Sequence, residues 1–144
     1  MKRSFSTSYP SDYLPILLLI VRVGVAALML THGYPKLMKL LGGDFAFRDP
    51  IVLGSGTSLV LAVLAEVVCS LLILIGAGTR LATIPLLFTM VVAAFIAHGS
   101  DPFGKKELPL LYMLMYLVLL VMGNGKYSVD HMVTKKILDQ KQVP

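Results

Sequence analysis

The stretch LPILLLIVRVGVAALMLTHGYPKL, residues 14–37, decides the fold. It is long enough to cross a bilayer core of about 30 Å, which takes roughly 20 apolar residues in a helix. Pro15 suits the first turn of such a helix, after Ser11 and Asp12 as cap residues. Arg22 interrupts the apolar run, and no small-residue cleavage site follows it. We therefore interpret the segment as a retained membrane helix and not as a cleaved signal peptide.

Three further apolar segments follow the first. We predict membrane spans over about 14–36, 57–76, 81–98 and 108–123, with the stretch 126–144 as a tail. Backbone groups in lipid must be hydrogen-bonded within the segment itself, which favours helices over strands. The predicted fold class is all-α, a polytopic membrane four-helix bundle that forms a single domain over residues 1–144.

The composition agrees with a membrane protein. Of the 144 residues, 56% are hydrophobic and 15% are charged, and the mean hydropathy is +0.80, whereas soluble domains are roughly a quarter charged. The net charge of +5 comes from short basic runs between apolar segments. Such runs are typical of charges that flank spans, so we expect the lipid bilayer and no nucleic acid as a partner. Cys69 is the one cysteine, which excludes an intramolecular disulfide and a CxxC pair.

The basic residues also predict an orientation. Four spans place the N-terminus, the second loop and the tail on one side of the membrane, and the first and third loops on the other. The first side carries more lysine and arginine, so we predict that both termini are cytoplasmic. The two sets are Lys2, Arg3, Arg80, Lys126, Lys135, Lys136 and Lys141 on the first side, and Lys36, Lys39, Arg48, Lys105 and Lys106 on the second.

Two opposite charges fall inside predicted spans. Arg22 lies near the middle of the first span and Glu66 near the middle of the second. An unpaired ion in hydrocarbon costs several kcal/mol, so we predict that these two residues form a buried charge pair. The pair would serve as a clamp between helices or as a charge relay to a bound redox ligand. Asp130, beyond the fourth span, is predicted to reach Arg80 as an inner-face pair.

A second group of polar residues converges at the opposite, outer face. His32 and Lys36 lie one turn apart, His98 ends the third span, and Glu107 begins the fourth. Three interpretations stay open: a polar network, a pocket for the head group of a quinone or similar molecule, or a metal site. No H-x-x-H spacing supports a metal, and no nucleotide motif is present. Tyr112 and Tyr116, one turn apart, would line a flat ligand or pack in the core.

Several of these pieces, in this order, resemble the DoxX family of small four-helix membrane proteins over Leu17 to His131. The resemblance implies an inner (plasma) membrane bundle linked to respiratory or sulfur-linked redox chemistry. We therefore expect a protein that binds a quinone or similar redox molecule within a membrane system, as a subunit of a quinone-linked oxidoreductase. The alternative is a non-enzymatic accessory subunit or small-molecule carrier. A redox partner protein and a homo-oligomer stay open. The matching pieces are Leu19-x-x-Arg22, His32-Gly33-x-x-Lys36, Ala65-Glu66, Leu72-x-Leu74-x-Gly76-x-x-Thr79-Arg80, His98, Glu107 and Gly123-Asn124-Gly125-Lys126-Tyr127-Ser128-Val129-Asp130.

Overall fold

The computed structural model describes residues 12–140 of the chain. It is helical, with no strand among these residues, and it confirms the predicted all-α class. Lys2, Arg3, Ser11 and Lys141, which entered the predicted cap and the charge comparison, lie outside the described residues.

The helices follow the predicted spans closely, with one addition after them. The predicted tail forms a helix over most of its described length. The elements are α1 (Leu14–Leu41), α2 (Ser55–Val63), η2 (Leu64–Cys69), α3 (Ser70–Ile75), α4 (Thr79–Val91), η3 (Val92–Ala97), α5 (Phe103–Met122) and α6 (Val129–Gln140). The segments η2 and η3 are π-helical and continue the helices before them, so the second helix runs from Ser55 to Ile75 and the third from Thr79 to Ala97.

Glycines with positive φ end the second helix and begin the third. Gly76 has φ +73° and Gly78 has φ +57°, a left-handed conformation that glycine adopts with little strain. The chain therefore reverses within the short turn 76–78, and the two helices form an antiparallel hairpin. Gly123 also has a positive φ, +75°, where α5 ends, but its ψ of −156° lies outside the left-handed helical region.

Among residues 12–140, three helices are long and apolar enough to cross a membrane: Leu14–Leu41, Ser55–Ile75 and Thr79–Ala97. The helix α5 is also 20 residues long, but it carries Lys105, Lys106 and Glu107 near its start. The predicted fourth span, 108–123, is the apolar remainder of this helix.

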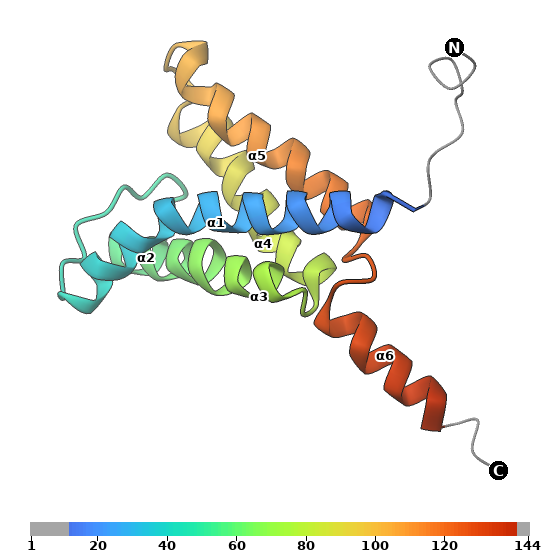
Figure 1. Ribbon diagram of the computed structural model, residues 1–144. Coiled ribbons are helices and arrows are strands. Elements are labelled where there is room, and N and C mark those ends of the chain that lie inside the picture. The colour runs from blue at the N-terminus through green and yellow to red at the C-terminus, as the bar shows by residue number, and fades with distance from the viewer. Residues whose placement is uncertain (1–11, 141–144) are drawn as a thin grey trace, which may run out of the picture.

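The helices pack as two pairs. Helix α1 lies along α2, η2 and α3, while α4 and η3 lie along α5 (Figure 1). Fully buried side chains where the pairs meet include Met29, Ile73, Leu86, Tyr116 and Leu119. Helix α6 points away from the bundle (Figure 1), and its apolar side chains are exposed. The core therefore lies within the four long helices.

Candidate functional site

A lysine and a glutamate form an ion pair inside the bundle. Lys36 Nζ on α1 bonds Glu66 Oε1 on η2. The glutamate side chain is 4% exposed and the lysine side chain 27%, so the carboxylate is buried and the ammonium lies nearer the surface. The other carboxylate oxygen, Glu66 Oε2, is also buried and has no hydrogen-bond partner among the described residues. A buried acceptor without a donor is costly, on the order of 1–3 kcal/mol, and this makes Oε2 a candidate ligand contact.

Small residues bring these two charges together. Gly33, one turn before Lys36, lies against the backbone of Glu66 and the side chain of Val67. The missing side chain lets α1 and η2 approach closely, as small residues commonly do between membrane helices. The close approach places the lysine within reach of the glutamate.

The pair that we predicted, Arg22 with Glu66, does not form. Arg22 instead donates from Nη1 to the carbonyl oxygen of Asn124 at 3.2 Å and from Nη2 to that of Tyr127 at 2.6 Å. In the antiparallel packing of the first two helices, Arg22 lies against Gly76 while Gly33 lies against Glu66. The eleven residues from Arg22 to Gly33 separate the two levels by about 16 Å of helix.

The predicted pairing of Arg80 with Asp130 is also corrected. Asp130 does reach the tight hairpin, but its carboxylate accepts the backbone N–H of Gly78 at 2.9–3.0 Å and the side-chain amide of Asn124. Arg80 donates to the carbonyl oxygen of Val121 at 3.1 Å. A left-handed glycine turn exposes its N–H groups, and the aspartate satisfies one of them.

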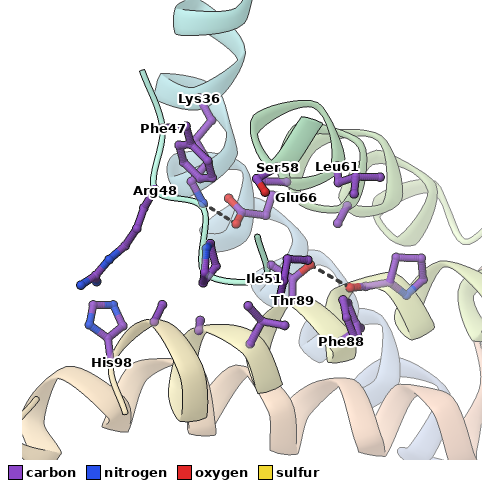
Figure 2. Close-up of a pocket in the computed structure, with 17 residues that line it drawn as sticks. Lys36, Phe47, Arg48, Ile51, Ser58, Leu61, Glu66, Phe88, Thr89 and His98 are labelled. Atoms are coloured by element: carbon purple, nitrogen blue, oxygen red, sulfur yellow. Dashed lines mark hydrogen bonds and ion pairs between the residues drawn. The ribbon is translucent and has the colours of Figure 1, made fainter. Parts of the chain in front are cut away.

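An apolar cavity of about 450 Å³ opens beside the ion pair. It lies between the second helix, the third helix and the loop 47–51, which covers one end (Figure 2). Polar groups gather toward one side of it, where Lys36 and Glu66 face each other and Arg48 stands above His98 (Figure 2). The lining residues are Lys36, Phe47, Arg48, Pro50, Ile51, Ser58, Leu61, Ala62, Ala65, Glu66, Pro85, Phe88, Thr89, Val92, Ala93, Ala97 and His98.

The loop over this cavity is fixed by an aspartate. Asp49 accepts the hydroxyl of Ser58 at 2.7 Å and the backbone N–H groups of Leu53 at 3.0 Å and Gly54 at 2.6 Å. The Ser58 hydroxyl is the main cause that lowers the pKa of Asp49 below its ordinary value, and the backbone N–H groups act in the same direction. The carboxylate thus anchors the loop to the start of α2, and Lys36 lies over the ring of Phe47, 5.7 Å from its centroid.

A smaller cavity of about 270 Å³ lies on the other side of the ion pair. Its walls come from α1, η3 and α5 and include His32, Lys105 and Tyr112. The two cavities share four residues, namely Lys36, Glu66, Ala93 and His98. The ion pair and His98 therefore stand in the partition between an apolar chamber and a more polar one.

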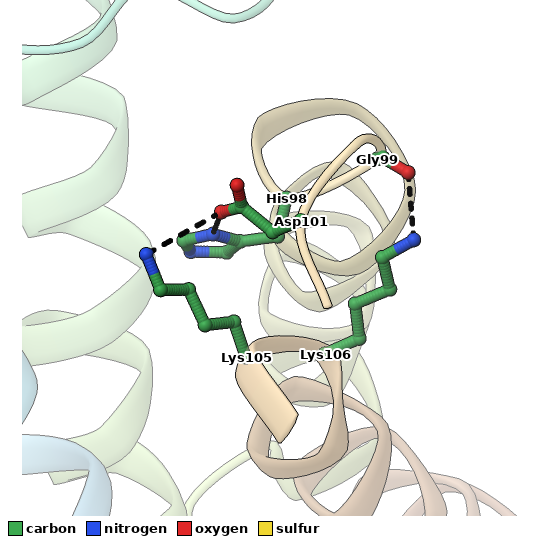
Figure 3. A network of polar contacts seen from close by, with 5 residues as sticks. All are labelled: His98, Gly99, Asp101, Lys105 and Lys106. Atoms are coloured by element: carbon green, nitrogen blue, oxygen red, sulfur yellow. Dashed lines mark hydrogen bonds and ion pairs between the residues drawn. The ribbon is translucent and has the colours of Figure 1, made fainter. Parts of the chain in front are cut away.

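His98 belongs to a polar network at the end of the third helix. Its Nδ1 donates to Asp101 Oδ2 at 2.7 Å, Lys105 Nζ lies 3.9 Å from the same oxygen, and Lys106 donates to the carbonyl oxygen of Gly99 at 2.6 Å (Figure 3). The hydrogen bond from His98 is the main cause that lowers the pKa of Asp101, and the charges of Lys105 and Arg48 act in the same direction. The network fixes the orientation of the His98 ring.

The structure brings together four of the six predicted ligand residues, His32, Lys36, His98 and Tyr112. Glu107 is exposed and lines neither cavity. Tyr116 is fully buried in the core, stacked on Tyr112 with ring centroids 6.2 Å apart. It lines neither cavity.

Glu66 was not predicted to lie with Lys36 and His98. Phe47, Arg48 and Asp101 were not predicted as site residues either. The aromatic and charged residues of the first loop were a signal, because recognition often lies in such loops. Within residues 12–140, no group of three His, Cys, Asp or Glu side chains could hold a metal ion.

The comparisons with known proteins agree with this architecture. The family model of DoxX matches residues 17–99. An uncharacterized protein of Haemophilus influenzae is 31% identical over 135 residues, which cover 86% of this chain and 96% of that protein. The inner membrane protein YphA of Escherichia coli is 30% identical over 128 residues, 81% of this chain and 89% of that protein. No solved structure gives a significant match.

Proposed function

From the premise that this chain belongs to the DoxX family and is a multi-pass inner membrane protein, we propose that it binds a small apolar redox molecule of the quinone class in the 450 Å³ cavity. The observation that carries the proposal is the position of Glu66. Its Oε2 is a buried acceptor without a partner among the described residues, and it lies at the wall of an apolar chamber within the membrane span.

The cavity matches such a ligand in size and in chemistry. Pockets for small molecules are typically about 300–1,000 Å³ and mostly apolar, with few polar groups that fix the orientation. Leu61, Phe88 and Val92 supply apolar walls for a ring and its tail. Lys36 and Arg48 supply donors for the carbonyl oxygens of a quinone. Glu66 Oε2 would accept the hydroxyl of the reduced form, the quinol.

The redox role calls for a partner. Cys69 is the one cysteine in the chain, and thiol–disulfide exchange within one chain needs two. We therefore propose that the protein holds the quinone within a larger membrane system. A carrier or accessory subunit would use the same cavity without electron transfer.

A ligand-binding experiment tests the proposal. Purified protein in detergent is titrated with ubiquinone-1 and its reduced form ubiquinol-1, and binding is followed as a shift of the melting temperature. We expect a shift with wild type, and we expect Glu66→Gln to weaken binding of the quinol more than of the quinone. Organic extraction of freshly purified protein, followed by an optical spectrum, should yield a quinone.

A matched pair of substitutions locates the binding site. Leu61 lines the cavity and is 46% exposed, whereas Leu64 is 49% exposed on the same helix and does not line it. Leu61→Trp should fill the chamber and abolish the ligand-induced shift, while Leu64→Trp should leave the shift intact. Equal shifts in both variants, or no shift in wild type with either form, would reject a quinone site in this cavity.

A further inference from the structure

The His98–Asp101 pair lies between the buried ion pair and the surface of the bundle. The Glu66 side chain is 4% exposed, whereas the side chains of His98 and Asp101 are 32% and 29% exposed. His98 lines both cavities together with Glu66 and is hydrogen-bonded to Asp101 on its other side. His98 and Asp101 are therefore both partly exposed to water, whereas Glu66 is buried beside the cavities that His98 also lines.

His98 has two carboxylates in its surroundings, Glu66 and Asp101. Both carboxylates near it already have a cation, since Glu66 is bonded to Lys36 and Asp101 lies near Lys105. Histidine is the side chain that ordinarily exchanges a proton near neutral pH. The charged and titratable groups that face its surroundings are His32 and Lys36 from α1, Arg48 from the loop, Glu66 from η2, and Lys105 and Tyr112 from α5.

We infer that His98 and Asp101 are the proton-exchange route between the ligand cavity and water. The inference rests on the proposed function. A proton from the ligand hydroxyl arrives at His98 Nε2. The proton on Nδ1 then leaves through the Asp101 carboxylate to water. One proton enters the ring and one leaves it, no electron moves, and exchange with water restores the first tautomer.

The test uses a quinone that reports its own protonation. The hydroxyl of 2-hydroxy-1,4-naphthoquinone ionises in water, and its anion is coloured. Wild-type protein saturated with this probe is subjected to a pH jump in a stopped-flow instrument, and the absorbance of the bound probe is followed. His98→Gln and Asp101→Asn should slow the relaxation by on the order of tenfold or more, because a positioned acid–base group typically contributes at least that much. The final absorbance should match that of wild type.

Two controls separate proton transfer from a structural effect. His131→Gln changes the histidine at the other end of the molecule, on α6, and should relax as fast as wild type. Added imidazole should restore the rate of His98→Ala, because it supplies the lost group without repairing the fold.

Equal relaxation rates in wild type, His98→Gln and Asp101→Asn, with probe bound, would overturn the route and leave the quinone site standing. Failure of wild type to bind the probe or ubiquinone-1 would overturn both. If His98→Gln does not fold, Asp101→Asn decides alone.

Discussion

Gly33 of α1 lies directly against the backbone of Glu66 in η2. A β-carbon at residue 33 would stand 3.0 Å from the carbonyl oxygen of Glu66 and 2.8 Å from Cγ2 of Val67. This contact fixes the level at which the two helices face each other. It therefore determines that Lys36, one turn further along α1, and not Arg22, neutralises the buried carboxylate.

We expect Gly33→Ala to destabilise the protein by about 1–3 kcal/mol, because an added methyl group in a packed contact forces the helices apart. Gly24→Ala is the matched control on the same helix. A β-carbon there meets nothing within 4 Å, so the change should be neutral or stabilise by up to about 1 kcal/mol. Thermal unfolding in detergent, followed by circular dichroism, measures both. Equal effects would contradict the close contact.

Double-mutant cycles should identify the partner of Glu66. We expect Lys36→Met and Glu66→Leu to be coupled by about 1–3 kcal/mol, because each single change leaves a lone charge. We expect a coupling energy toward the lower end of this range, because the Lys36 side chain is partly exposed to solvent. Arg22→Met and Glu66→Leu should add within about 0.5 kcal/mol. Strong coupling in the second cycle would restore the pairing predicted from the sequence.

The loop over the cavity should respond to acid. Its anchor, Asp49, has a lowered pKa. The hydrogen bonds of Asp49 therefore stabilise the fold above the ordinary pKa of an aspartate and are lost as the pH falls through the lowered value. Ser58→Ala removes the hydroxyl that is the main cause of the lowered pKa, so it should raise the pKa of Asp49. Ser55→Ala, on the same helix, should leave this pKa unchanged. Carboxyl carbon NMR during a pH titration reads the value directly, and an unchanged Asp49 pKa in Ser58→Ala would refute the assigned cause.

The orientation in the membrane stays a prediction from the charges of the loops. Reporters fused after Pro144 should be active when they need the cytoplasm, and reporters inserted near Gly104 should be active when they need the outside. The reverse pattern would place the His98–Asp101 route on the cytoplasmic face. Removing the charge bias, by replacing Lys135 and Lys136 with glutamine, should lower the fraction of molecules in the predicted orientation.

Much of the candidate site could be predicted from helix geometry. His32 and Lys36 share a face because residues four apart lie one turn apart, and His98 joins them because alternate helix ends meet at the same membrane face. The positions of Phe47 and Arg48 beside the cavity could not be predicted, because an irregular loop has no helical period from which the direction of a side chain can be read. The same spacing also predicted Tyr116 as a ligand residue beside Tyr112, but Tyr116 is buried in the core.

The sequence by itself determined the helices. Runs of apolar residues, bounded by Gly76, Gly78 and Gly123, are local features. In lipid, the backbone of each run must form its hydrogen bonds within the run, which favours a helix. Only the tertiary structure decided which charges meet. The level at which one helix faces another depends on close contacts such as Gly33 with Glu66 and on the path of the loop between them. A shift of about four turns exchanges Arg22 for Lys36 and leaves every local pattern intact. Helical periodicity repeats along the axis, so it does not specify depth.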